Sequence, residues 1–188
     1  IENKRIVLFK NNLPNYGVFD EKRIFLKGPK YKCIKFKKLK IGLMICEDMW
    51  TEDVAKSLIK DKADFFICIN ASPFDHDKLK YRKSVASKIT RLANKPLMYV
   101  NQVGGQDELV FDGSSFVIGI NGNILNNLAA WKEEVKLVEV NFDKKANIII
   151  KKNRNNVLVN KNFNTWSALV LGLRDYVFKN SFKKIILG

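Results

Sequence analysis

Ile41-Gly-Leu-Met-Ile-Cys-Glu-Asp-Met-Trp50 carries the main structural signal of this chain. Its first five residues are apolar, which predicts a fully buried strand over residues 41–45. Cys46 follows this strand directly, where a turn would begin, and the acidic pair Glu47-Asp48 comes next. A thiol in that place faces an opening rather than a core. Cys46 is therefore either the nucleophile of an acyl-transfer enzyme or a buried structural thiol, and Asp48 is interpreted as a cap of the turn.

The sequence around this segment alternates strand and helix patterns. Strands are expected at 5–9, 31–39 (an edge strand), 41–45, 64–70, Leu97–Asn101, 115–120, 123–128, 135–142 and 183–188. Helices are expected at Glu52–Lys60 behind a Thr51 cap, at 77–94 and at 166–180, with a loop at 11–20 and turns at 111–113 and 121–122. This order predicts a mixed α/β layered domain.

The helix expected at 77–94 has the clearest pattern. Its apolar stripe consists of Leu79, Val85, Ala86, Ile89, Leu92 and Ala93. Its opposite face carries Lys78, Lys80, Arg82, Lys83 and Lys88. Such a pattern predicts a helix that packs one face on a sheet and exposes the other.

Composition limits the class of protein. The chain has 188 residues, 46% of them hydrophobic and 28% charged, which suits one globular domain with a sizeable core. No apolar run approaches the ~20 residues of a membrane span. Cys33, Cys46 and Cys68 are an odd number without metal-type spacing, which favours a reducing, cytoplasmic setting. One histidine, His76, argues against a Ser-His-Asp triad and against a His-rich metal site.

The formal net charge of +15 permits a nucleic-acid-binding function. However, the basic residues are mostly Lys, are spread thinly, and occur with many Asn and Ile. All three have AT-rich codons, so a biased genome explains the charge without a nucleic-acid partner. Nucleic-acid binding stays open only as a remote alternative.

Lys10 ends a predicted strand, as Cys46 does. Two strands that end side by side would bring the ammonium close to the thiol, where a cation favours the thiolate and can stabilise an oxyanion. A lone lysine on so basic a chain is more often a surface residue. The residues alone leave both interpretations open.

Five ordered motifs resemble one family. They are Lys10-Asn-Asn-Leu-Pro-Asn-Tyr-Gly-Val-Phe-Asp-Glu21, Gly42-Leu-Met-Ile-Cys-Glu-Asp-Met-Trp50, Ile69-Asn-Ala-Ser-Pro-Phe74, Asn101-Gln-Val-Gly-Gly-Gln-Asp-Glu108 and Phe111-Asp-Gly-Ser-Ser115. Together they resemble the nitrilase, or carbon–nitrogen hydrolase, superfamily, and within it the glutaminase domains of glutamine-dependent NAD synthetases. The resemblance implies an α/β fold of the nitrilase type, here a partial αββα sandwich of mixed sheets flanked by helices.

The resemblance also implies a reaction, the release of ammonia from glutamine for NAD synthesis. Cys46 would attack the carboxamide and form a thioester, and Lys10 would stabilise the oxyanion together with the backbone N–H of Glu47. The family uses a Glu–Lys–Cys triad whose glutamate lies well upstream of the lysine, and only nine residues precede Lys10. We therefore expect the general base to be absent from this chain and its activity alone to be very low. Glu21 and Glu47 are possible accessory carboxylates.

Substrate contacts in the family correspond to Tyr16, Ser72 and Lys78, which would bind L-glutamine. No metal and no cofactor is expected within this chain, because ATP and Mg²⁺ would bind a synthetase domain. We expect residues 1–142 to be a partial glutaminase domain, 143–164 a linker, and 165–188 the truncated start of that synthetase domain. Related synthetases are homo-oligomers, which implies the same tendency here. The start Ile1-Glu-Asn-Lys4 is interpreted as a cut.

A non-catalytic relic, cut at both ends, remains the main alternative to an active glutaminase portion. Cys33 and Cys68 are interpreted as structural thiols, and His76 as a loop or helix-start residue.

Overall fold

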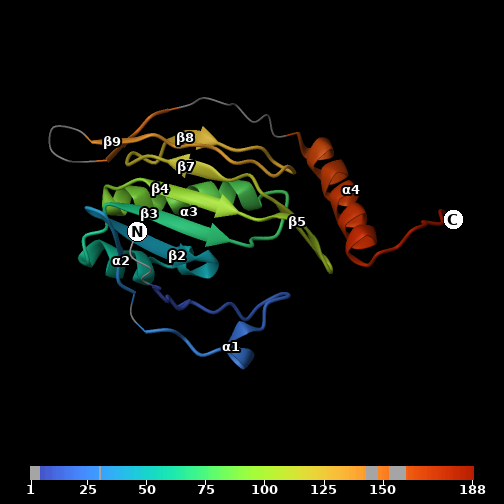
Figure 1. Cartoon of the computed structure of the whole chain (residues 1–188), viewed down its shortest axis with the longest axis horizontal. Coiled ribbons are helices and arrows are strands. Elements are labelled where there is room, and N and C mark those ends of the chain that lie inside the picture. Colours follow the sequence, from blue (N-terminus) through green and yellow to red (C-terminus); the bar gives the residue numbers. More distant parts are fainter. Residues whose placement is uncertain (1–4, 30, 143–147, 153–159) are drawn as a thin grey trace.

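The computed structural model describes residues 5–29, 31–142, 148–152 and 160–188 (Figure 1). Its centre is a six-stranded sheet in the order β1-β2-β3-β4-β7-β8. The strands are β1 (Ile34–Phe36), β2 (Leu39–Ile45), β3 (Phe65–Asn70), β4 (Leu97–Asn101), β7 (Phe116–Ile118) and β8 (Ile124–Asn127). β2, β3 and β4 run parallel, and the other pairs are antiparallel.

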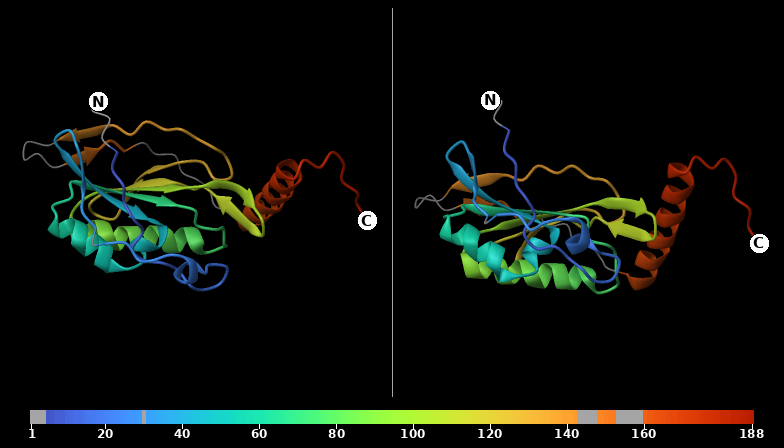
Figure 2. Two further views of the ribbon diagram at one scale, coloured as in Figure 1. Left: turned by 60° about the horizontal axis from the view of Figure 1, so that its bottom comes forward. Right: turned by 90° about the horizontal axis from the view of Figure 1, so that it is seen from below.

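Two helices make the parallel connections. The α2 helix (Glu52–Lys60) lies between β2 and β3, and the α3 helix (Lys78–Ala93) lies between β3 and β4. Both cover the same face of the sheet, and the β9–β10 hairpin covers the other (Figure 2). The hairpin consists of β9 (Val140–Phe142) and β10 (Ile148–Ile150). The layers are therefore helices, sheet and hairpin, a mixed α/β fold as the sequence predicted.

Each face of the sheet has its own core because side chains alternate along a strand. In β3, Phe66 and Cys68 are buried against the helices, whereas Phe65 packs with Ile148 and Ile150 of the hairpin. Gly42 has its place in β2 because a Cβ there would lie 2.8 Å from the Phe66 ring. The apolar run beside Cys46 is thus packed on both sides.

A second hairpin and the last helix pack together. β5 (Val103–Gln106) pairs with β6 (Leu109–Asp112), and α4 (Lys161–Lys179) lies against this hairpin at one end of the molecule (Figure 1). The Asp175 carboxylate accepts the Gly105 N–H at 2.7 Å, and Lys179 donates to the Gly105 carbonyl at 2.7 Å. The α4 helix therefore packs against the glycine-rich motif at 101–108.

Several sequence predictions hold. The Glu52–Lys60 helix and the Leu97–Asn101 strand have the expected bounds. Residues 11–20 are a loop, and Gly122 takes the turn at φ +77°. Thr51 is at the cap position of α2, but its hydroxyl donates to Asp53 instead of capping the helix.

Other predictions are wrong. Residues 5–9 form no strand because no neighbouring strand pairs with them within the described ranges, and Ile6, Val7 and Phe9 are exposed. For the same reason residues 183–188 are irregular. The strand expected at 135–142 shortens to β9. The expected turn at 111–113 begins in β6, and β5 was not foreseen.

Three further differences concern helices and the predicted linker. The linker range 143–164 contains β10 and the first turn of α4, while residues 143–147 and 153–159 lie outside the described residues. A short helix, α1 (Glu21–Ile24), follows the loop at 11–20. In α3, Arg82 was expected on the exposed face but is fully buried, because its guanidinium pairs with the buried carboxylate of Asp112. Within the described residues, no helix combines the length and apolarity that crossing a membrane requires.

Candidate active site

The candidate site lies where the three parallel strands end. The carboxyl ends of β2, β3 and β4 meet at one edge of the sheet, which is where open α/β sheets bind ligands. Cys46 follows β2, Ala71 and Ser72 follow β3, and Asn101 ends β4. The sequence therefore brings its candidate nucleophile to the expected edge.

Cys46 occupies a sharp turn. Its φ is +48°, in the left-handed region that non-glycine residues rarely adopt, and it begins a 3₁₀ turn, Cys46–Met49. We call residues 45–49 the Cys46 turn. Strained backbone of this kind clusters at functional sites.

Lys10, Glu21 and Cys46 line the same cavity of about 600 Å³. Lys10 Nζ lies 2.6 Å from both carboxylate oxygens of Glu21. Of the other lining residues only Asn70 is polar. The rest are apolar, namely Phe9, Leu13, Phe19, Phe25, Leu26, Ile45, Ile69 and Ala71. A thiol, an ammonium and a carboxylate thus line one mostly apolar cavity.

Burial and the neighbouring charges shift the pKa of the Cys46 thiol in opposite directions. Burial raises the pKa of Cys46, the charge of Lys10 lowers it, and the charges of Glu47 and Glu21 raise it. The net pKa is raised above the ordinary value of 9.0. The neutral thiol therefore predominates at neutral pH, and nucleophilic attack by Cys46 requires a group that accepts its proton.

Asp48 is the residue whose importance the sequence reasoning underestimated. Its side chain is fully buried and accepts four hydrogen bonds. Oδ1 accepts from the N–H groups of Asn11 at 3.0 Å and Asn12 at 2.7 Å. Oδ2 accepts from the Ile45 N–H at 3.0 Å and from the Tyr31 hydroxyl. Its position two residues after Cys46, beside the buried Met49, was the available signal.

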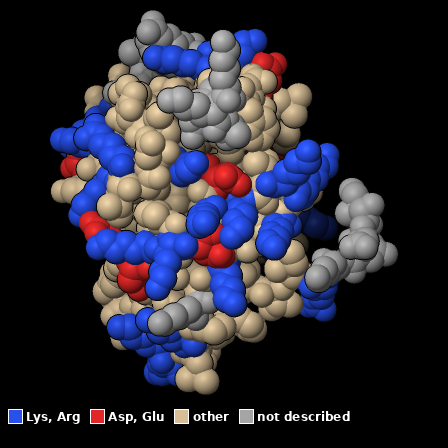
Figure 3. Space-filling model, turned by 90° about the vertical axis from the view of Figure 1, so that its left-hand side faces the viewer, with Lys and Arg blue, Asp and Glu red and all other residues tan. Residues whose placement is uncertain are grey.

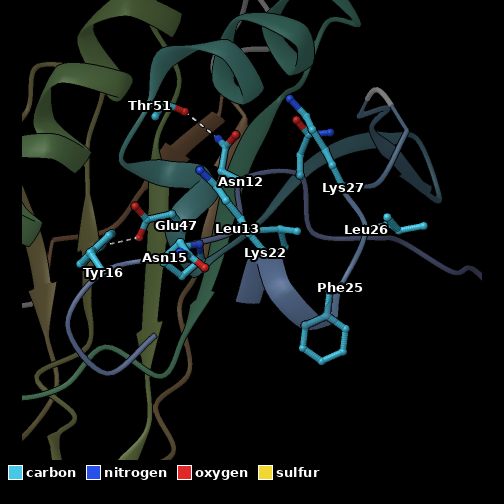
Figure 4. A pocket seen from close by; sticks show the side chains of 12 residues that line it. Asn12, Leu13, Asn15, Tyr16, Lys22, Phe25, Leu26, Lys27, Glu47 and Thr51 are labelled. Carbon is cyan, nitrogen blue, oxygen red and sulfur yellow. Dashed lines mark hydrogen bonds between the residues drawn. The ribbon is translucent and has the colours of Figure 1, made fainter. Parts of the chain in front are cut away.

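A second cavity of about 580 Å³ adjoins the first, with Leu13, Phe25 and Leu26 in both linings. Figure 4 shows Tyr16 facing Glu47, and the Tyr16 hydroxyl donates to Glu47 Oε2 at 2.8 Å. Burial and this hydrogen bond raise the pKa of Tyr16 to about 12, so it remains a donor at neutral pH. Tyr16 of the loop at 11–20 is thus hydrogen-bonded to Glu47, the residue that follows Cys46.

Ser72 lies behind the site in a buried network. Its N–H donates to Asn101 Oδ1 at 2.9 Å, and Arg82 Nε donates to its hydroxyl at 3.1 Å. Arg82 also donates to the carbonyls of Ser72 and Pro73 and to Asp112 Oδ1, at 2.7, 2.8 and 2.7 Å. These partners explain why Arg82 is buried. Only 3% of Ser72 is exposed, so its hydroxyl is held by Arg82 rather than presented to a cavity.

Lys78 starts α3 and lies over Trp50, with 4.8 Å between its Nζ and the ring centroid. The structure therefore brings Lys10, Glu21 and Cys46 together and pairs Tyr16 with Glu47. Ser72 and Lys78 line neither of the two cavities.

Two observations bear on metal and nucleic acid. Among the residues that the structure describes, no group of three or more His, Cys, Asp or Glu could hold a metal ion. On the face shown in Figure 3, Lys and Arg side chains are spread widely with acidic side chains between them. The basic charge visible there is dispersed, as the sequence suggested.

Comparisons with known sequences agree with the motifs. The model of the carbon–nitrogen hydrolase family matches residues 2–148. The glutamine-dependent NAD(+) synthetase of Acinetobacter baylyi is 37% identical over 179 residues, which is 95% of this chain and 32% of that protein. The synthetase of the same name from Synechocystis sp. is 34% identical over 187 residues, 94% of this chain and 33% of that protein. The chain spans about a third of the length of the curated relatives it matches.

Solved structures give the same result. The glutamine-dependent NAD+ synthetase of Acinetobacter baumannii, in complex with ADP, superposes with a TM-score of 0.87 and 38% identity over 96% of this chain and 34% of that one. A carbon–nitrogen hydrolase from Helicobacter pylori G27 has a TM-score of 0.63 at 22% identity over 95% of this chain and 61% of that one, a likeness of fold alone. The family match, which covers most of the chain, shows that this chain belongs to the carbon–nitrogen hydrolase family.

Proposed function

We propose that this chain is the glutaminase portion of a glutamine-dependent NAD synthetase and that Cys46 is its nucleophile. The observation that carries the proposal is the shared cavity of Cys46, Lys10 and Glu21, with Cys46 in a left-handed turn at the end of a parallel strand. The similarity of the chain to glutamine-dependent NAD synthetases supports glutamine as the substrate.

The proposed chemistry is acyl transfer to sulfur. Cys46 Sγ attacks the carboxamide carbon, the C–N bond breaks, and ammonia leaves with the thiol proton. Water then cleaves the thioester, which yields glutamate and restores the thiol. Lys10 and the Glu47 N–H would stabilise the oxyanion in both steps. Because burial raises the pKa of Cys46, a general base must take the thiol proton, and the family supplies a glutamate for this role.

The roles of the remaining residues belong to the same proposal. Tyr16 and Glu47 would bind the polar end of glutamine, since their pair lies on the loop beside Cys46. Lys78 would attract the α-carboxylate once it leaves the Trp50 ring. Ser72 would act through its backbone or after a shift of Arg82, because its hydroxyl is engaged in the structure. Glu21 would hold Lys10 in place as an accessory carboxylate.

The wider setting is also proposed. Residues 1–142, together with β10, would form the glutaminase portion, and 165–188 the start of a synthetase domain that binds ATP and Mg²⁺ and uses the ammonia. A cytoplasmic homo-oligomer fits this setting, on the cysteine composition and the family resemblance described above. The comparisons support neither alternative, a non-catalytic relic or a nucleic-acid-binding protein.

A covalent probe tests this function without requiring turnover. The probe is a glutamine analogue with a diazoketone in place of the carboxamide. Attack by the thiol forms a C–S bond, releases N₂ and places the thiol proton on the probe carbon. We expect mass spectrometry to find the adduct on Cys46 rather than on Cys33 or Cys68, and the Cys46→Ala variant to remain unlabelled.

Two controls make this test specific. L-glutamine should slow the labelling of Cys46 more than D-glutamine does, because only a built site distinguishes the enantiomers. Labelling spread over the three cysteines, or equal protection by both enantiomers, would contradict the proposed function. Iodoacetamide, which needs no amino-acid site, reports whether the thiol itself is accessible.

A further inference from the structure

We propose that Asp48 is a positioning residue that holds residues 10–12, here called the loop of Lys10, against the Cys46 turn. The inference rests on the proposed roles of Cys46 and Lys10. It assigns to Asp48 the task of keeping these two groups, which belong to separate segments of the chain, in one cavity.

The geometry of the carboxylate supports this role. Its two oxygens face different segments. Oδ1 accepts from the N–H groups of Asn11 and Asn12, the two residues that follow Lys10. Oδ2 accepts from the N–H of Ile45, the residue before Cys46. One carboxylate therefore ties the residues next to the lysine to the residue next to the thiol.

The surroundings make this bridge rigid. Asp48 is fully buried, and the Tyr31 hydroxyl adds a fourth donor to Oδ2. Hydrogen bonds to a buried, ionised carboxylate are stronger than bonds between neutral groups. The Asn11 side chain extends the network, since it donates to the Gly28 carbonyl at 2.9 Å. Few other conformations of the loop would satisfy these groups.

An amide cannot replace the carboxylate at this point. Three N–H groups and one hydroxyl are directed at the two oxygens of Asp48. In Asp48→Asn, one oxygen becomes an NH₂ group that faces N–H donors, so at least one buried donor loses its partner. The loop of Lys10 would then leave its place, and Cys46 would lose the cation that favours its thiolate.

The test measures the rate at which iodoacetamide alkylates Cys46 between pH 6 and pH 10, followed by mass spectrometry of the Cys46 peptide. We expect Asp48→Asn to react about tenfold more slowly at pH 8, because a lost cation raises the pH needed to form the thiolate. Removing the negative charge of Asp48 would by itself favour the thiolate. A slower reaction therefore reports displacement of Lys10 and not the change of charge.

A double-variant cycle separates this inference from the proposed function. Lys10→Met should slow alkylation in the same way, and Asp48→Asn should add little in the Lys10→Met background. If Lys10→Met slows the reaction but Asp48→Asn does not, the inference on Asp48 fails and the proposed function stands. If Lys10→Met leaves the rate unchanged, both fail.

Two more variants guard against a trivial loss of folding. Asp61→Asn is a matched control, because Asp61 also accepts a backbone N–H, that of Cys33 at 2.7 Å, and pairs with Lys40. It should leave Cys46 alkylation unchanged, and slowing as large as in Asp48→Asn would overturn the inference. Tyr31→Phe removes only one donor and should slow alkylation less. It carries the test if circular dichroism shows that Asp48→Asn is unfolded, and an unchanged rate in this variant would then overturn the inference.

Discussion

The guanidinium of Arg82 lies 2.7 Å from the carboxylate of Asp112, and both side chains are buried. The two residues are 30 positions apart in the chain, one on α3 and the other at the end of β6. Arg82 also holds the carbonyls of Ser72 and Pro73. One cation thus fixes the loop after β3 beside the site.

Arg82→Met should destabilise the protein by about 3–5 kcal/mol, because it leaves Asp112 buried without a partner and two carbonyls without donors. Urea unfolding followed by circular dichroism measures this loss. Arg91→Met, at an exposed position of the same helix, should cost about 0.5 kcal/mol or less. Equal losses in the two variants would show that the buried network does not stabilise the fold.

Glu21→Gln keeps a side-chain oxygen that can accept from Lys10 Nζ, and it should make Cys46 alkylation faster at neutral pH. The charge of Glu21 raises the pKa of Cys46, and the charge of Lys10 lowers it. Removing the carboxylate therefore moves the alkylation profile to lower pH, whereas Lys10→Met moves it to higher pH. The control is Glu52→Gln, since Glu52 pairs with Lys56 and Lys88 on the surface and its loss should have no effect. Shifts of the same sign in the two site variants would contradict the proposed arrangement.

Tyr31→Phe should cost about 1–3 kcal/mol at neutral pH, because a buried charged acceptor loses a donor. The difference should shrink as pH rises above 10. Burial, and then the hydrogen bond to Asp48, raise the pKa of Tyr31 above its ordinary value of 10.0. A raised folded-state pKa gives stability that is complete below the unfolded value and is lost as pH rises.

Urea unfolding of wild type and Tyr31→Phe between pH 7 and pH 11 measures this dependence. A constant difference across the range would show that the Tyr31 proton contributes nothing. Tyr81→Phe, at an exposed tyrosine, should match wild type at every pH.

Gly42→Ala should destabilise the protein by about 1–3 kcal/mol through overpacking. The new Cβ would lie 2.8 Å from the Phe66 ring, inside the core under the helices. The double variant Gly42→Ala/Phe66→Leu should cost less than the sum of the single variants, because the smaller side chain makes room. Thermal unfolding measures all three, and additive losses would exclude this contact as the cause. For Gly188→Ala, whose added methyl would meet nothing within 4 Å, no change is expected.

Local patterns predicted the elements that bury a continuous apolar face. The bounds of α2 and β4 follow from hydrophobic spacing and from Pro96, which ends the preceding helix pattern. Residues 5–9 have an equally apolar pattern but form no strand, because a strand needs a partner in addition to propensity. Helical periodicity predicted Arg82 on the exposed face of α3. Periodicity shows which residues share a face of a helix, but it does not show which hydrogen-bond acceptors of other segments lie against that face.

The sequence by itself determined that Cys46 follows a buried strand, that five motifs stand in family order, and that the chain has a mixed α/β fold of the carbon–nitrogen hydrolase family. The strand and each motif are short, continuous stretches, so the pattern of adjacent residues is enough to recognise them. Only the tertiary structure decided that Glu21 pairs with Lys10, that Arg82 is buried on Asp112, and that Asp48 joins the lysine loop to the Cys46 turn. Apart from the local bond between Ile45 and Asp48, these contacts join residues 11 to 36 positions apart in the chain. They therefore exist only after the strands have aligned and desolvated the groups that must then find partners.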